Sequence, residues 1–311
     1  MRRQLRVFLH FAVLSSIFSN LGLLESKAAQ IDRALQKRIS AAKDLRIPLS
    51  PNAGAYRAPS EGIIVDLRSG QVIRERLQYS DNIAGDPNNP NYMNWQRIDL
   101  PVKPANPRIV MILTVIAGKT SRCTGAVIHP QIILTAGHCV SAGNKGPFAT
   151  QVTVVPGYDR GNSPHGPYRG IKLATFSGWF DGEDNAHDIG VIQLERRLPS
   201  QVPGYPPQLT GNDCKAEFSM GFDRTTYDAV HDKDETQFMF QSKYMGCTKG
   251  TYWHPMPTDH GSSGAPAFVN GSIVGVMSAK DKTDKFGYDA RITQGKFCFI
   301  YQKLGDGAIC Y

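Results

Sequence analysis

The stretch Asp259-His260-Gly261-Ser262-Ser263-Gly264-Ala265-Pro266 combines two serines with two glycines and a proline. Glycine adopts backbone angles that other residues resist, so Gly261 and Gly264 predict a tight turn with little side-chain bulk. Such a turn can hold the Ser263 hydroxyl in a cleft and aim the N–H groups of Gly261 and Ser263 at one developing oxyanion. An ordinary surface loop would have the same composition, so this stretch alone leaves both interpretations open.

Two upstream segments supply what a serine nucleophile needs. Residues 132–139 are an apolar run that ends in a small-residue turn carrying His138, and Asp188 precedes the alternating apolar run 189–194. A neutral imidazole can take a hydroxyl proton near pH 7, and a carboxylate behind it fixes the tautomer and stabilises the imidazolium. We therefore predict Ser263 as the nucleophile, His138 as the general base and Asp188 as the residue that orients His138.

These residues lie in three motifs, Thr135-Ala136-Gly137-His138-Cys139, His187-Asp188-Ile189-Gly190-Val191 and Gly261-Ser262-Ser263-Gly264-Ala265-Pro266. The order His, Asp, Ser argues against an α/β-hydrolase, in which the serine comes first. With these motifs the chain resembles the chymotrypsin-fold (trypsin-like) serine peptidases over roughly residues 108–311, and within them the bacterial glutamyl-endopeptidase-like (V8-like) branch. The resemblance implies an oxyanion hole at the N–H groups of Gly261 and Ser263.

The resemblance also implies an all-β fold of two six-stranded antiparallel barrels with the active site in the cleft between them. Short strand-like runs separated by glycine and proline turns agree with this fold. We expect a first barrel over residues 106–200, with the histidine and aspartate, and a second over 201–311, with the serine and the specificity pocket. The expected strands are 110–116, 125–128, 132–135, 152–155, 171–176 and 189–194, then 217–222, 236–244, 265–270, 272–278 and 294–301.

The first hundred residues take no part in the resemblance. Residues 1–28 have an arginine-rich start, an apolar stretch and the small residues Ser26 and Ala28, which predicts a cleaved signal peptide and a secreted protein, extracellular or periplasmic. An uncleaved membrane anchor is the alternative, but polar interruptions make a poor spanning helix. Residues 29–105 are interpreted either as a propeptide, which would make the chain a zymogen, or as an N-terminal extension that is kept. Within them we expect a helix to about residue 47 and a possible hairpin over 63–73.

The chain has 6 cysteines, without a C-x-x-C pair or zinc-like spacing, which favours disulfides in an exported protein. The resemblance implies a bridge from Cys123 to Cys139, worth about 3 kcal/mol in the chain-entropy model. Pairing of the remaining four follows only from proximity in the sequence, as Cys214 with Cys247 and Cys298 with Cys310.

Specificity is the least determined part of the sequence. Glutamyl endopeptidases use a histidine on the strand that corresponds to residues 274–279, where this chain has Met277, although Thr258 matches a threonine of that branch. Lys280 would attract an acidic substrate side chain and Asp289 a basic one, so the P1 preference stays open. The candidate substrate-binding residues are Thr258, His260, Met277, Ser278 and Lys280.

Two neighbours of the proposed triad compete with it. His187 is adjacent to Asp188 and is expected on the loop surface, whereas Ser262 lacks the following glycine that Ser263 has. Trypsins of animals have an aspartate at the position of Ser262, which pairs with the new N-terminus, so that activation switch is not expected here.

Composition limits the class of function. The net charge is +8, and 20% of residues are charged and 41% hydrophobic, as in ordinary globular proteins. Basic residues do not alternate with aromatic ones in blocks, which gives nucleic-acid binding little support. We expect a monomeric enzyme without cofactor or metal that acts on proteins or peptides and has no stable membrane association after signal cleavage. The alternative is an inactive homologue that binds a partner.

Overall fold

The structure is a computed structural model that describes residues 61–77, 104–206, 250–252, 261–279 and 287–304 in full. It describes only the backbone of residues 43–44, 98–101, 218–222, 237–241, 246–247, 253–254 and 280. The predicted signal peptide, Thr258, His260, Cys214 and Cys310 lie outside the described residues. All described residues belong to one unit, Ala42–Tyr311.

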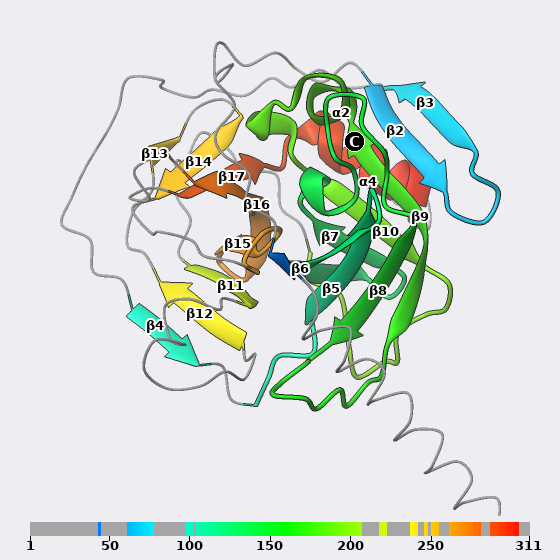
Figure 1. Ribbon diagram of the computed structural model, residues 1–311. Helices are drawn as coiled ribbons and strands as arrows, with labels where there is room; N and C mark the ends of the chain where they lie inside the picture. The colour runs from blue at the N-terminus through cyan, green and yellow to red at the C-terminus, as the bar shows by residue number, and fades with distance from the viewer. Residues whose placement is uncertain are drawn as a thin grey trace, which may run out of the picture. The chain divides into compact units, whose positions relative to one another are not determined.

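The first half of the described chain forms a closed barrel of six antiparallel strands (Figure 1). Their order is β10-β7-β6-β5-β8-β9, and pairing of β9 with β10 closes the ring. The predicted strands of this half are confirmed, with some boundaries moved. The strands are β5 (Ile109–Ile116), β6 (Lys119–His129), β7 (Ile132–Thr135), β8 (Gln151–Pro156), β9 (Tyr168–Phe176) and β10 (Gly190–Leu194).

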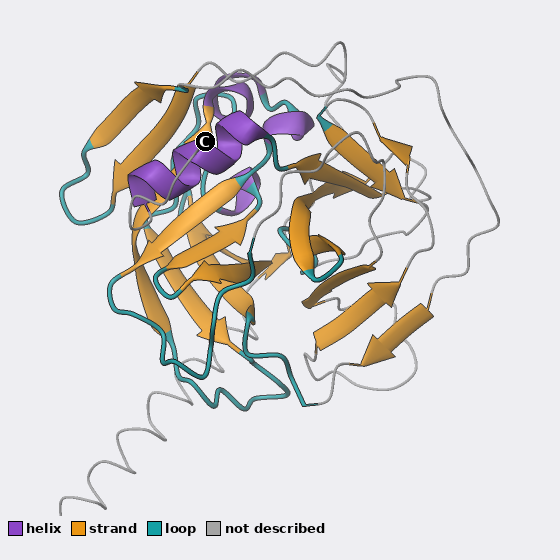
Figure 2. Ribbon diagram, turned by 180° about the vertical axis from the view of Figure 1, so that it is seen from behind, coloured by secondary structure: helices purple, strands orange, loops and turns teal. Residues whose placement is uncertain are grey.

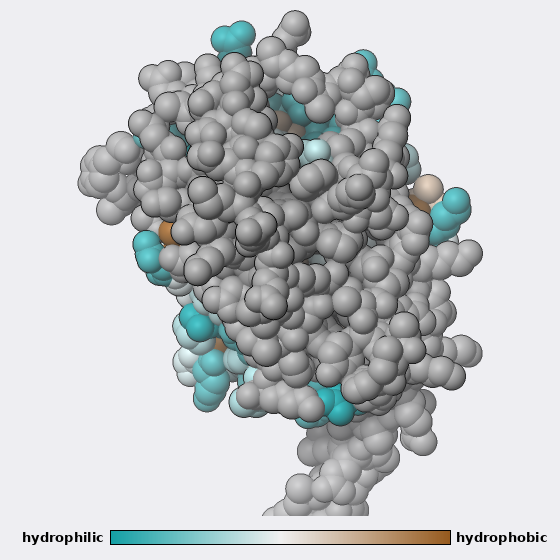
Figure 3. All heavy atoms as spheres, turned by 90° about the vertical axis from the view of Figure 1, so that its left-hand side faces the viewer, coloured by the Kyte–Doolittle hydropathy of each residue, from teal (hydrophilic) through white to brown (hydrophobic). Residues whose placement is uncertain are grey.

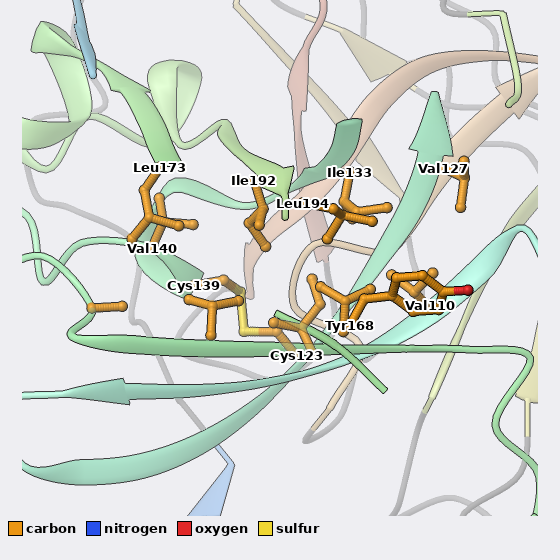
Figure 4. Close-up of a cluster of buried hydrophobic side chains, with 14 of the residues drawn as sticks. Val110, Cys123, Val127, Ile133, Cys139, Val140, Tyr168, Leu173, Ile192 and Leu194 are labelled. Atoms are coloured by element: carbon orange, nitrogen blue, oxygen red, sulfur yellow. A yellow bond between two sulfur atoms is a disulfide. The ribbon is translucent and has the colours of Figure 1, made fainter. Parts of the chain in front are cut away.

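The interior of this barrel is filled by aliphatic side chains from all six strands (Figure 4). Val110 and Ile112 of β5 point inward at a spacing of two, as strand geometry requires, and both are fully buried. Burial of one such side chain is worth about 1.5–3 kcal/mol, so the packed barrel is a rigid platform for its loops. The bridge between Cys123 and Cys139 lies in the same cluster.

A second sheet of eight strands has the order β13-β14-β17-β16-β15-β11-β12-β4. Its pairs are antiparallel, which agrees with the predicted all-β fold. One edge strand, β4, comes from the segment upstream of the resemblance. The strands are β4 (Ile98–Pro101), β11 (Phe218–Phe222), β12 (Gln237–Gln241), β13 (Gly246–Cys247), β14 (Thr251–His254), β15 (Pro266–Val269), β16 (Ser272–Lys280) and β17 (Gly287–Arg291).

The strand predicted at residues 294–301 is wrong, because this segment is the helix α4 (Gln294–Leu304). Alternation of Phe297, Phe299 and Tyr301 suggested a strand. The fully or nearly fully buried residues Lys296, Ile300 and Leu304 instead recur every four positions, which is the spacing of one helix face. Burial on the first barrel also raises the pKa of Tyr301 to about 12.

Residues upstream of the resemblance contribute strands to the first sheet as well. The predicted hairpin is confirmed as β2 (Glu61–Asp66) and β3 (Val72–Arg76), and β2 pairs antiparallel with β9. The short β1 (Lys43–Asp44) lies parallel to β6, so the helix expected there is wrong at those two residues. Removal of residues 29–105 during maturation stays a prediction.

The described residues at the surface are mostly hydrophilic on the side seen in Figure 3. Val72 and Ile73 of the hairpin are the large hydrophobic side chains exposed within the described part, at 55% and 39%. None of the helices in the described ranges has the length and apolar character needed to cross a bilayer.

Contact between the hairpin and α4 gives a test of this packing. A Cβ added at Gly62 would lie 2.1 Å from the Phe299 ring, whereas one at Gly182 would meet no atom within 4 Å. Gly62→Ala is expected to lower the free energy of unfolding by about 1–3 kcal/mol through overpacking. Gly182→Ala, the control, is expected to change it by less than about 0.5 kcal/mol. Urea titration measures both, and equal stability of the two variants would contradict the contact.

Candidate active site

His138 lies directly after a barrel strand, in the 3-10 turn η1 (Gly137–Cys139) that follows β7. The adjacent Cys139 is bonded to Cys123 of β6, which confirms the predicted bridge and ties the histidine turn to the barrel wall. Cys298 is also disulfide-bonded. Its partner and the pairing of Cys214, Cys247 and Cys310 stay predictions, because they involve residues outside the fully described ranges.

Asp188 binds His138 twice, through both carboxylate oxygens. Oδ2 is 2.7 Å from the His138 ring Nδ1, and Oδ1 accepts the His138 backbone N–H at 2.7 Å. Both side chains are fully buried. With Nδ1–H donating to the carboxylate, Nε2 keeps the lone pair and is free to accept a proton. Nε2 is buried and has no hydrogen-bond partner among the described residues.

A further pair of side chains supports this carboxylate from the second sheet. Ser278 of β16 donates its hydroxyl to Asp188 Oδ2 at 2.6 Å and accepts the Asn185 side-chain amide at 3.2 Å. Because the amide N–H occupies a lone pair of the serine oxygen, the one hydroxyl proton is directed at the carboxylate. Ser278 was predicted to contact substrate, and this stays a prediction; in the structure its hydroxyl proton is donated to Asp188.

The serine turn is held between the two sheets by its backbone. Thr124 of β6 donates its backbone N–H to the Ser263 carbonyl at 2.8 Å and its hydroxyl to the Gly261 carbonyl at 2.7 Å. From β16, the Met277 carbonyl accepts the Gly264 N–H at 2.8 Å. The Ser263 carbonyl also lies 3.8 Å from Cys139 Sγ, so the turn reaches the immediate neighbour of His138. Ser263 itself is half-buried.

Both predicted turn glycines have backbone angles that favour glycine. Gly261 has φ +99° and Gly264 has φ +82°. A Cβ at Gly264 would lie 2.2 Å from Thr135 Oγ1 and 2.4 Å from the Thr124 carbonyl oxygen. Gly264 therefore allows the turn to approach the first barrel more closely than any other residue would.

Trp179 supports the other side of His138 and was missed in the sequence. It belongs to α2 (Ser177–Gly182), is 1% exposed, and its ring centroid is 6.0 Å from that of His138. Its indole N–H donates to the Ser141 carbonyl at 3.2 Å. A Cβ on Gly137 would lie 2.7 Å from this indole, so the histidine turn needs glycine there. Trp179 lies 41 positions from His138, and its sequence surroundings gave no sign of the contact.

The expected surface position of His187 is wrong, because this residue is 1% exposed. It belongs to η2 (Asn185–His187), where a Cβ on Gly178 would be 2.1 Å from its ring and Nε2 is 3.5 Å from Asp184 Oδ2. Burial raises the pKa of the Asp184 carboxyl, while a hydrogen bond from the Ala186 N–H opposes that change. His187 thus belongs to the packed support of the aspartate loop.

Two residues considered for specificity, Met277 and Asp289, are buried next to each other in the second sheet. Met277 is 2% exposed, and its register partner on β17 is Asp289, which is 1% exposed. The side chains of paired residues extend to the same face of a sheet, so these two are neighbours. The other candidates, Thr258, His260 and the side chain of Lys280, lie outside the described residues.

Comparison with known proteins gives the family. A family model described as Trypsin matches residues 103–296, which is more than half of the chain. The chain belongs to the trypsin family. Over 180 residues it is 26% identical to an extracellular metalloprotease of Bacillus subtilis (strain 168), covering 54% of this chain and 56% of that protein. Over 90 residues it is 36% identical to a glutamyl endopeptidase of Bacillus licheniformis, covering 29% and 28%.

This trypsin-family chain thus spans about half of the first relative and under a third of the second. Among solved structures it is similar to a Glu endopeptidase in complex with MPD, with a TM-score of 0.56 and 21% identity over 66% of this chain and 94% of that one. The protease Anisep from Arthrobacter nicotinovorans gives 0.53 and 19% over 62% and 93%. At these identities the structures show the fold alone, and the predicted resemblance to chymotrypsin-fold proteases and their V8-like branch is confirmed.

Because the first relative is a protein named extracellular metalloprotease, we tested whether the described residues could hold a metal ion. Within the described residues, the ligand atoms of Cys123, His138 and Cys139 lie within 4.8 Å of one another. The two sulfurs are bonded to each other, and one histidine nitrogen is engaged by Asp188. This donor set does not fit a metal ion, because thiolate ligands need free sulfurs. We therefore derive no metal-dependent step.

Close approach of the serine turn gives a second stability test. In Gly264→Ala, the new Cβ would be strained by the positive φ and would also clash with main-chain atoms of the first barrel. In Gly271→Ala, at φ +75°, the backbone would be strained in the same way, but the new Cβ would have no atom within 4 Å. The control is expected to lose about 1–2 kcal/mol of unfolding free energy. Gly264→Ala is expected to lose about 2–4 kcal/mol, because overpacking adds to the strain. Chemical denaturation compares them, and equal losses would show that the turn does not press on the barrel.

Proposed function

We propose that this trypsin-family protein is a secreted serine endopeptidase that cleaves peptide bonds in proteins or peptides. The observation that carries the proposal is the buried Asp188–His138 pair, in which the carboxylate binds the ring at 2.7 Å and leaves Nε2 to act as a base. Anchoring of the serine turn on Thr124, beside Cys139, supports convergence of Ser263 on the same place.

In the proposed reaction, His138 Nε2 takes the proton of Ser263 Oγ while the oxygen attacks the substrate carbonyl carbon. The carbonyl oxygen becomes an oxyanion that the N–H groups of Gly261 and Ser263 stabilise. The C–N bond then breaks as His138 passes its proton to the leaving amine, and an acyl-enzyme remains on Ser263. Water, activated by the same imidazole, releases the acid and restores the serine. Asp188 stabilises the imidazolium without taking its proton.

The name of one relative, glutamyl endopeptidase, favours an acidic P1 side chain, while Met277 in place of the histidine of that branch argues for a different pocket. The alternative of an inactive binding protein is less well supported. Homologues that have lost activity usually lack a triad residue, and this chain has all three candidates, with His138 and Asp188 already paired.

Replacement of the nucleophile tests the proposal. Ser263→Ala is expected to lower kcat by at least about 10⁴-fold, because triad members act as a unit. Ser262→Ala, which removes the adjacent hydroxyl, is expected to retain most activity. A fluorophosphonate probe should add to Ser263 in the mature protein, as read by peptide mass spectrometry. Full activity of Ser263→Ala would refute the role of Ser263 as the nucleophile. A mature protein that does not react with the probe would favour the alternative of an inactive homologue that binds a partner.

Histidine as the base predicts the pH dependence. The value of kcat/KM is expected to rise as the pH increases from acidic to neutral, because only the unprotonated imidazole can accept the proton of Ser263. The sign follows because protonated His138 cannot take the serine proton. Initial rates on a fixed peptide substrate measure the profile. Activity that is flat down to about pH 4 would contradict a histidine base.

A further inference from the structure

The β2–β3 hairpin, residues 61–77, lies along β9 at one end of the first barrel (Figures 1 and 2). Pairing of β8 with β9 involves Tyr168 and Arg169, and β2 pairs with β9 further on, from Lys172 to Phe176. The hairpin buries Ile63 fully, and Ile64 and Val65 are 7% and 6% exposed. It therefore continues both the sheet and its hydrophobic core.

One set of contacts joins the hairpin to α2, the helix that supports His138. The Arg74 guanidinium binds both carboxylate oxygens of Asp181, at 2.9 and 3.0 Å, and lies 5.4 Å from the Phe180 ring centroid. These hydrogen bonds hold the pKa of Asp181 below its usual value, so the pair is ionised at neutral pH. The Glu61 N–H donates to the Ser177 hydroxyl at 3.3 Å. Trp179, against the His138 ring, belongs to the same helix.

A second set joins the hairpin to the end of the chain and to the barrel. Gly62 lies against the Phe299 ring of α4, and that ring packs edge-on against Phe176 at 5.5 Å. Glu75 pairs with Lys303 at 2.5 Å. At the hairpin turn, Arg68 pairs with Glu195 after β10 at 2.7 Å. Without the hairpin, Phe176 and Phe299 would lose their cover, and the edge of β9 would lose its backbone partners.

The described contacts of the hairpin go to β9, α2, α4 and Glu195, whereas those of the serine turn go to Thr124, Cys139 and Met277. A segment that inhibits by blocking the site has to cover the reacting groups, and the described contacts of this hairpin do not reach them. Loss of this hairpin would instead uncover hydrophobic core and one edge of a sheet, while the described contacts of the serine turn would remain.

We propose that residues 61–77 stay in the active enzyme as a permanent brace that holds α2, and with it Trp179, against His138. In the mature protein, this segment therefore covers the surface formed by β9, α2 and α4. It stays bound even where processing cuts the chain between residues 77 and 104. The effect on activity rests on the proposed function, whereas retention of the segment does not.

Retention is tested on the folded protein. A recognition sequence for a site-specific protease is inserted between residues 78 and 97, cut after purification, and the product is passed over a sizing column. We expect the peptide that contains residues 61–77 to co-elute with the barrel and activity to persist. Peptide mapping of the naturally secreted active enzyme should also recover this segment. Active enzyme that lacks residues 61–77 in either preparation would overturn the proposal.

Two arginine variants separate bracing from simple attachment. Arg74→Ala removes the ion pair with Asp181 of α2, while Arg68→Ala, the control, removes the arginine–carboxylate pair with Glu195 at the other end of the hairpin. Both should speed loss of the cut peptide several-fold. Only Arg74→Ala should lower kcat, by several-fold with KM unchanged, because only it loosens the support of His138. Equal kcat in the two variants would refute the brace, and fluorophosphonate labelling of Ser263 checks the proposed function separately.

Discussion

A buried carboxylate sets the main constraint on this protein. Asp188 is completely removed from solvent, and an unpaired ionised carboxylate in that position would cost many kcal/mol. It is stabilised by the backbone and ring of His138 and by the Ser278 hydroxyl, each within 2.7 Å. These donors come from the turn after β7 and from β16 of the second sheet. The two sheets therefore have to meet correctly before this charge is tolerated, which couples assembly of the fold to assembly of the proposed site.

The part of this arrangement that is local in sequence could be predicted. Apolar runs bounded by glycine and proline gave the strands of the first barrel, and the residues around His138, Asp188 and Ser263 gave the family. The contacts of Asn185 and Trp179 could not be predicted, because they depend on side chains that meet across 93 and 41 positions of the chain. His187 was misplaced for a more local reason, because its own motif does not indicate that Gly178 leaves room for its ring against α2.

The segment 294–301 shows how a local pattern can mislead. Alternating aromatic residues matched the period of a strand, but this segment makes contacts in two directions. Phe299 packs on Phe176, while Lys296 reaches the loop before Asp188, and one helix satisfies both sets of contacts. The upstream region presented the opposite problem, because a hairpin was predicted there but the turn-rich composition gave no sign of which strands the region would pair with. Its strands β2 and β4 nevertheless extend the first and the second sheet, and only the structure shows those partners.

Lys296 has an implication for the order of events during synthesis. Its ammonium group is completely buried, and it donates to the carbonyls of Ala186 at 2.6 Å and Arg291 at 3.0 Å. Ala186 lies two residues before Asp188, so the loop that presents the aspartate is held by a residue in the first turn of α4. A ribosome adding residues from the N-terminus delivers this fastening more than a hundred positions after the loop that it holds. Nascent chains that already carry His138 and Asp188 but have not reached Lys296 therefore lack this anchor of the aspartate loop.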